Sequence, residues 1–133
     1  MVQKKYTKTY HIIFDAFGVD AKILNSEKVI LDLLLNIPKL IEMKILSGPN
    51  LVRDYDTGHE GLSAFEIIDY SHISIHTFVD TQEAFVDIFS CRPFDYEKVR
   101  NYLYKALRVE ALQVETLEVK YPWEENNESD RAS

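Results

Sequence analysis

The segment Ser71–Val79 (SHISIHTFV) sets polar against apolar side chains in alternation. Successive side chains of a strand point to opposite faces, so His72, Ser74 and His76 share one face and Ile73, Ile75 and Thr77 share the other. The pattern predicts a half-buried β-strand whose polar face carries two histidines and a serine. Any strand with one solvated face shows such alternation, so the pattern by itself assigns no chemistry.

The rest of the chain divides into further strands and two helices. A helix follows a cap at Asn25 or Ser26 and is limited by Pro38, and a second helix is capped by Asp95. Ser47–Glu60 is a loop by composition. The remaining predicted strands are Tyr10–Phe17, Ile41–Ile45, Leu62–Asp69, Ala84–Cys91 and Leu112–Val119.

This element order predicts an α+β fold. The order β-α-β-β followed by β-β-α-β gives a two-layer α/β sandwich with a mainly antiparallel sheet. Two helices cover only one face of a six-stranded sheet, so the other face is solvated or buried by a partner. Its aromatic side chains favour a homodimer.

Length and charge narrow the classes of function. The 133 residues suffice for one domain, expected over 1–120, followed by an acidic, disordered tail over 121–133. The net charge of −7 disfavours binding to nucleic acid. No apolar run approaches the ~20 residues that a membrane helix needs, and the N-terminus is polar, so a cytoplasmic protein without membrane contact is expected. A single cysteine excludes an internal disulfide framework.

Several residues qualify as candidates for chemistry. On a strand, His72 and His76 lie ~13 Å apart and cannot share one zinc ion, so no metal site is expected. Cys91 is either a small buried apolar side chain or a thiol that needs an activating neighbour. Asp87 stands between Phe85 and Phe89, an arrangement that suits a cationic ligand or simply a sheet edge.

Two of these segments resemble the core of the prokaryotic S-adenosylmethionine decarboxylase proenzymes. Ser71–Phe78 matches Ser-His-x-[Ser/Thr]-Ile-His-Thr-aromatic, and Ala84–Cys91 matches Ala-x-x-Asp-[Ile/Leu]-Phe-[Ser/Thr]-Cys. Gly61–Ser63 resembles the family's Gly-x-Ser, and His11–Asp15 resembles its first strand. The resemblance covers roughly residues 9–120.

The resemblance implies a self-cleaving, pyruvoyl-dependent decarboxylase of polyamine and spermidine biosynthesis. The chain would be cut between Tyr70 and Ser71, and Ser71 would become a covalent pyruvoyl group without any metal. That group would form a Schiff base with the substrate amine, and CO₂ would leave. Ser63 and His76 match residues that assist processing, and Cys91 matches the proton donor. A homodimer of cleaved protomers is implied, with active sites near the interface.

The sequence departs from the family at the cleavage site and around the substrate. Tyr70 stands where the family usually has Glu, with Asp69 as a neighbouring carboxylate. Asp15 replaces the usual Glu of the first strand. Phe78 matches one adenine-stacking aromatic, whereas the other position falls near Thr57, with Tyr55 the nearest aromatic.

These changes leave three alternatives. The substrate is S-adenosylmethionine, or it is arginine or ornithine on the same fold. A non-enzymatic alternative is an uncleaved regulatory paralogue, which Tyr70 motivates and the intact set of Ser63, Ser71, His76 and Cys91 disfavours.

Overall fold

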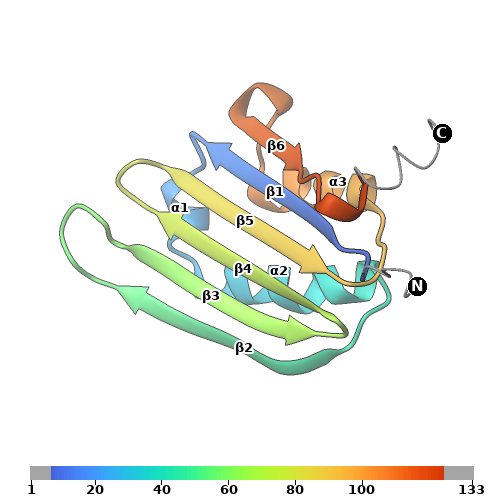
Figure 1. The fold of residues 1–133 in the computed structure, drawn as a ribbon. Coiled ribbons are helices and arrows are strands. Elements are labelled where there is room, and N and C mark those ends of the chain that lie inside the picture. The colour runs from blue at the N-terminus through green and yellow to red at the C-terminus, as the bar shows by residue number, and fades with distance from the viewer. Residues whose placement is uncertain (1–6, 125–133) are drawn as a thin grey trace, which may run out of the picture.

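The structure is a computed structural model that describes residues 7–124. Six strands form one antiparallel sheet in the order β2-β3-β4-β5-β1-β6 (Figure 1). The elements in chain order are β1 (Tyr10–Phe17), α1 (Ala21–Leu24), α2 (Glu27–Leu40), β2 (Ile45–Asp54), β3 (Gly61–Ile68), β4 (Ser71–Phe78), β5 (Glu83–Ser90), α3 (Tyr96–Leu107), the 3-10 turn η1 (Ala111–Gln113) and β6 (Val114–Glu118). The predicted α+β sandwich and its order of strands and helices are confirmed.

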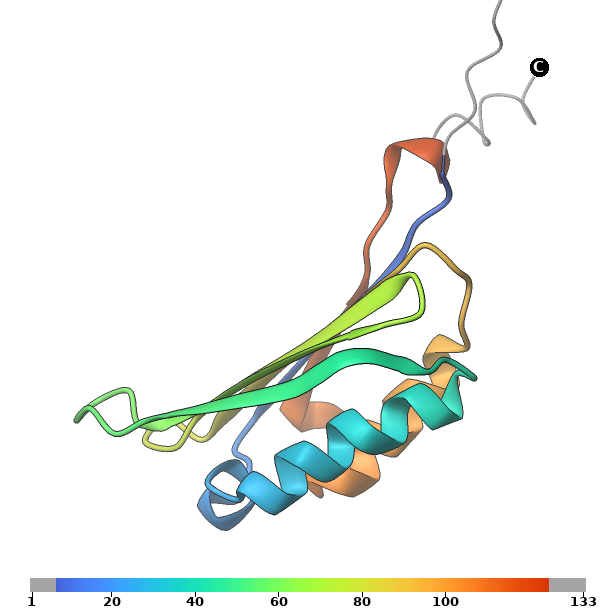
Figure 2. The same ribbon diagram turned by 90° about the horizontal axis from the view of Figure 1, so that it is seen from below.

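Both long helices pack on one face of the sheet, which Figure 2 shows edge-on. Alternate side chains of the strands are buried there, among them Phe14 of β1, Ile75 of β4 and Ile88 of β5. The apolar stripes of α2 and α3 cover them, with Leu34 and Leu103 fully buried. We call this the inner face and the opposite side of the sheet the outer face. Neither long helix covers the outer face, and Tyr121 packs beside His11 and Phe89 at one corner of it.

Helix α2 begins where one of the two candidate caps predicts and ends later than expected. The Ser26 hydroxyl accepts the Val29 N–H at 3.2 Å, so Ser26 is the N-cap. The helix continues through Pro38 to Leu40. Proline lacks the N–H of a helical hydrogen bond, but Ile37 and Pro38 are both buried, and their packing offsets that loss.

The predicted strand at Ile41–Ile45 and the predicted loop at Ser47–Glu60 are wrong. Ile41 caps α2, whereas β2 starts at Ile45 and runs to Asp54, leaving a short loop over 55–60. The loop-like Gly48-Pro49-Asn50 sequence forms an irregularity in the β2–β3 register. Proline and glycine are tolerated there because β2 is an edge strand and the bulge needs no regular ladder bond.

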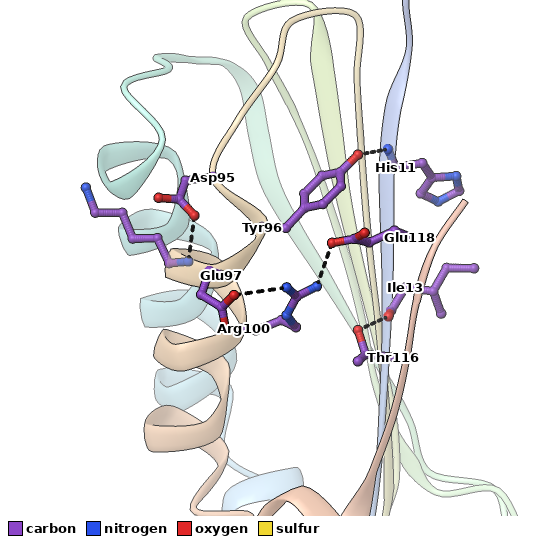
Figure 3. Close-up of polar contacts among 9 residues, drawn as sticks. His11, Ile13, Asp95, Tyr96, Glu97, Arg100, Thr116 and Glu118 are labelled. Carbon is purple, nitrogen blue, oxygen red and sulfur yellow. Dashed lines mark hydrogen bonds and ion pairs between the residues drawn. The ribbon is translucent and has the colours of Figure 1, made fainter. Parts of the chain in front are cut away.

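Helix α3 is tied to the edge of the sheet by polar contacts (Figure 3). Asp95 caps α3 as predicted, and the Tyr96 hydroxyl accepts the His11 backbone N–H at 2.9 Å. Arg100 bonds Glu118 of β6 at 3.1 Å. Strand β6 is shorter than predicted, because η1 occupies the residues before Val114.

The first residues of the predicted acidic tail contact β1. Trp123 donates from its indole to the Thr9 carbonyl at 2.9 Å, and its ring lies 5.6 Å from that of Tyr10. The Tyr121 hydroxyl lies 2.8 Å from His11 Nδ1. The predicted disorder over 125–133 falls outside the described residues. No helix within residues 7–124 is long and apolar enough to cross a membrane.

Candidate active site

The cleavage site predicted by the resemblance lies in a tight turn. Ile68 pairs with Ser71, so Asp69 and Tyr70 alone connect β3 to β4. Tyr70 has a φ of 54°, in the left-handed region that costs a non-glycine residue roughly 1–2 kcal/mol. Its side chain is 71% exposed. The peptide bond at the predicted cleavage site therefore follows a residue with a strained backbone and an exposed side chain.

The carbonyl of Tyr70 has a fixed partner. It accepts a hydrogen bond from the backbone N–H of Cys91 at 2.9 Å. Cys91 itself is exposed, directly after β5. The pairing of β4 with β5 thus brings together the two residues that the resemblance assigns to pyruvoyl formation and proton donation.

Ser71 points to the inner side of the sheet and is buried. Its single hydroxyl proton has three acceptors within reach: Ser90 Oγ at 2.5 Å, the Asp69 carbonyl at 2.7 Å and Met43 Sδ at 3.2 Å. The nucleophile expected for self-cleavage is therefore held among polar groups at the end of an otherwise apolar core.

Ser63 and His76 form a second polar pair on the outer face. Ser63 Oγ lies 2.8 Å from His76 Nδ1, and the two residues are paired in the β3–β4 register. His76 stands five residues after Ser71 on the same strand, ~16 Å along it. Within one chain, this pair and Ser71 lie at opposite ends of β4 and are not in contact.

The predicted substrate-binding residues gather mostly at the His76 end. Phe78 packs edge-on against Phe85, with ring centroids 5.7 Å apart. Tyr55 follows β2 and is 78% exposed, with the Arg53 guanidinium 5.9 Å from its ring. A shallow pocket of about 260 Å³ lies beside the Ser63–His76 pair, lined by Asn50, Val52, Ser63, Ala64, Phe65, Ser74 and His76.

Two of the predicted carboxylates have different surroundings. Asp15 lies on the outer face of β1, where burial and the nearby Glu115, Asp87 and Glu83 raise its pKa above the ordinary value. Asp69 instead accepts the Lys44 backbone N–H at 2.8 Å and fastens the turn to the approach to β2. Asp15 thus lies in an acidic cluster, whereas Asp69 is hydrogen-bonded within the turn.

A stack of rings crosses strands β3, β4 and β5 on the outer face, next to the Ser71 end. His72 lies between Phe65 and Phe89, with centroid distances of 5.5 and 5.3 Å and nearly parallel planes. His11 Nε2 lies 2.6 Å from Asp87 Oδ1 beside this stack. Asp87 therefore has a histidine partner that sequence reasoning did not foresee, because the β1–β5 pairing creates it.

A separate polar group lies near Tyr55. Asp54, Asp56 and His59 place one ligand atom each within 4.8 Å of the others, and all three are exposed. Asp54 accepts the Asp56 N–H at 2.9 Å, and this bond is the main cause that lowers the Asp54 pKa. The three residues are thus held by hydrogen bonds among themselves in an exposed loop.

Sequence reasoning missed two buried polar residues, Ser90 and Glu66. Ser90 was visible only as the residue before Cys91, and its contact with Ser71 depends on the β4–β5 register. Glu66 belongs to β3, faces the core and is fully buried; neither carboxylate oxygen has a partner among the described residues. An acidic residue amid the apolar alternation of β3 was the available signal for Glu66.

Most of the described chain matches a known protein family. The family model for S-adenosylmethionine decarboxylase matches residues 10–119. This match places the sheet, with Ser71 and Cys91 at the same end of the β4–β5 pair, in the class of pyruvoyl-dependent carboxy-lyases. The chain belongs to the S-adenosylmethionine decarboxylase family.

Individual relatives agree at modest identity. The S-adenosylmethionine decarboxylase proenzyme of Clostridium botulinum (strain Langeland) is 28% identical over 110 residues, which cover 81% of this chain and 90% of the relative. That of Thermoanaerobacter sp. (strain X514) is 30% identical over 106 residues, covering 75% and 78%. That of Pyrobaculum islandicum is 34% identical over 82 residues, covering 61% and 62%.

Proposed function

We propose that this chain cuts itself between Tyr70 and Ser71 and then decarboxylates S-adenosylmethionine. One observation carries the proposal: the Cys91 N–H bonds the Tyr70 carbonyl at 2.9 Å, next to the buried Ser71 hydroxyl. An amide N–H at that position polarises the carbonyl for attack. The products would be residues 1–70 and 71–133.

The residues present fit a pyruvoyl group made from Ser71. Only a residue with a β-hydroxyl or β-thiol group can attack the preceding carbonyl and then undergo elimination. When formed, the pyruvoyl group supplies a carbonyl that binds the substrate amine and withdraws electrons as CO₂ leaves. The exposed Cys91 thiol then returns a proton to the substrate carbon.

The outer face suits a substrate with positive charge and a flat ring. Its acidic part consists of Asp15 and the three carboxylates that help to raise the pKa of Asp15, which are Glu83, Asp87 and Glu115. Phe78 and Phe85 supply an aromatic wall beside it. S-adenosylmethionine carries a sulfonium, an ammonium and an adenine, and its decarboxylated product would serve aminopropyl transfer in polyamine and spermidine synthesis.

The proposed active unit is a homodimer in which outer faces meet. A two-fold axis between the sheets and perpendicular to the strands would lay the Ser63–His76 pair of one protomer over the Ser71–Cys91 end of the other. Exposed apolar side chains at Phe65, Ile67 and Leu117 support burial of this face. The proposal includes a cytoplasmic location, which a single free cysteine supports.

An assay of CO₂ release tests the function. Purified protein is supplied with S-adenosylmethionine, arginine or ornithine in separate reactions, beside the Ser71→Ala variant. We expect CO₂ from S-adenosylmethionine with the wild type and none with the variant. Release from arginine or ornithine alone would overturn the substrate, and release by Ser71→Ala would overturn the pyruvoyl chemistry.

A further inference from the structure

Ser90 is a polar exception on the buried side of β5. The other inner-face residues of this strand are Ala84, Val86 and Ile88, all buried. Ser90 is 0% exposed, so its hydroxyl has left water entirely. Burial of a hydroxyl is costly unless it is hydrogen-bonded, so the hydrogen bonds of Ser90 indicate the role of its side chain.

The Ser90 hydroxyl joins the nucleophile to the neighbouring bend. Its oxygen lies 2.5 Å from Ser71 Oγ and accepts the backbone N–H of Arg92 at 2.9 Å. Between those contacts stands Cys91, whose N–H bonds the Tyr70 carbonyl. One side chain therefore fixes both the attacking oxygen and the amide that polarises the carbonyl.

We infer that Ser90 positions the first step of self-cleavage, a role that rests on the proposed function. In that step the bond from Ser71 Oγ to the Tyr70 carbonyl carbon forms and the Tyr70–Ser71 amide bond breaks. The hydroxyl proton ends on the freed Ser71 nitrogen, so the amide becomes an ester and no co-reactant is consumed. Ser90 accepts the hydrogen bond of the attacking hydroxyl and keeps the Cys91 amide in place.

Within the same chain, no described imidazole is hydrogen-bonded to Ser71 Oγ to assist this attack. His76 is ~16 Å away along β4, and it faces the outer side, whereas Ser71 Oγ faces the inner side. The other acceptors of Ser71 are the Asp69 carbonyl and the Met43 thioether. Ser90 is the side-chain oxygen closest to the nucleophile.

The test follows cleavage of newly synthesised protein by intact mass, with and without hydroxylamine, which splits esters but not amides. We expect Ser90→Ala to slow cleavage roughly tenfold to a hundredfold, because one positioning contact is lost. Hydroxylamine should not restore the cut, since little ester forms. Ser90→Thr keeps the hydroxyl and should cleave at close to the wild-type rate.

Two further variants separate positioning from stability. Thr77→Val removes a different buried hydroxyl, on β4, that bonds the Leu62 N–H and the Leu24 carbonyl, and should lower the melting temperature without slowing cleavage. If Ser90→Ala fails to fold, Ser90→Cys fills the same space with a weak hydrogen-bonding group and should also be slow.

The outcomes distinguish the two proposals. A wild-type chain that stays uncut overturns the proposed function and this role with it. A wild type that is cut, beside a folded Ser90→Ala that is cut equally fast, overturns only the role of Ser90. Rescue of Ser90→Ala by hydroxylamine would also overturn it, because the ester would then form without Ser90.

Discussion

At the scale of single residues, two serine hydroxyl groups have different hydrogen-bond partners. Ser71 is buried against Ser90 at one end of β4, and Ser63 bonds His76 at the other end. A serine beside an imidazole is suited to proton transfer, whereas a serine beside another hydroxyl is oriented without a strong base. We therefore propose that the two pairs serve different steps of the same processing.

The Ser63–His76 pair predicts a slow His76 variant. His76→Ala should reduce the rate of self-cleavage by about 10²-fold, the usual contribution of a positioned proton-transfer group. Intact mass against time measures it, and His59→Ala, an exposed loop histidine, is the matched control. Cleavage of His76→Ala at the wild-type rate would remove His76 from processing.

Glu66 predicts that stability depends on pH. Burial raises the pKa of Glu66 from 4.5 to about 7, so the folded state keeps the proton over a range where the unfolded chain releases it. The free energy of unfolding is then largest below pH 4.5. It falls by up to about 3 kcal/mol as the pH rises to about 7, and it stays at the lower value above that pH.

The Glu66→Gln variant tests this dependence by chemical denaturation at pH 5 and pH 8. The variant cannot ionise, so it should be more stable than the wild type at pH 8 and similar at pH 5. Glu42→Gln, at an exposed position, should change neither value. An equal difference at both pH values would contradict ionisation of Glu66 as the cause.

Strands and helices differ in how well the sequence predicts them. Strand β4 follows from alternation and β1 from its apolar, aromatic run, and the capped helices follow from Ser26 and Asp95. Strand β2 was missed because Gly48 and Pro49 resemble a loop, although an edge strand admits them in a bulge. The motif identified Ser71 and Cys91, but the role of Ser90 depends on strand register, which no local pattern contains.

Two glycines can test whether the bulge in β2 fixes the β2–β3 register. Gly48 and Gly58 have nearly equal φ values of 94° and 93°, but a Cβ at Gly48 would lie 3.0 Å from the Phe65 carbonyl oxygen, whereas a Cβ at Gly58 meets nothing within 4 Å. Both alanine variants carry the backbone strain, and only Gly48→Ala adds the clash.

Gly48→Ala should therefore lower the free energy of unfolding by roughly 1–3 kcal/mol more than Gly58→Ala does, since residues must shift around an overpacked site. Thermal denaturation of the two variants measures the difference. Equal losses would show that the bulge relaxes freely and does not fix the β2–β3 register.

The whole molecule presents a site whose parts are separated within one chain. Ser71 and Cys91 lie at one end of the β4–β5 pair, and the Ser63–His76 pair lies at the other. The predicted strand Ser71–Val79 already implies that Ser71 and His76 lie apart, whereas the contact of Ser63 with His76 depends on the β3–β4 register, which no local pattern contains. A face-to-face homodimer would lay the Ser63–His76 pair of one chain over the Ser71–Cys91 end of the other.

Mixed dimers test this arrangement. A Ser71→Ala chain and a His76→Ala chain, each expected to remain largely uncut alone, are co-expressed with tags of different mass. The Ser71→Ala protomer would supply His76 to its partner, so the His76→Ala chain should be cut. Absence of any cut in the mixture, with dimers present by size, would show that each chain relies on its own histidine.

The most direct measurement is the intact mass of freshly purified wild-type protein under denaturing conditions. Self-cleavage at the proposed bond predicts two chains, 1–70 and 71–133, with the second lacking an N-terminal amine and carrying the mass of a pyruvoyl group. An uncut chain, or a second fragment that begins with an intact Ser71, would contradict it.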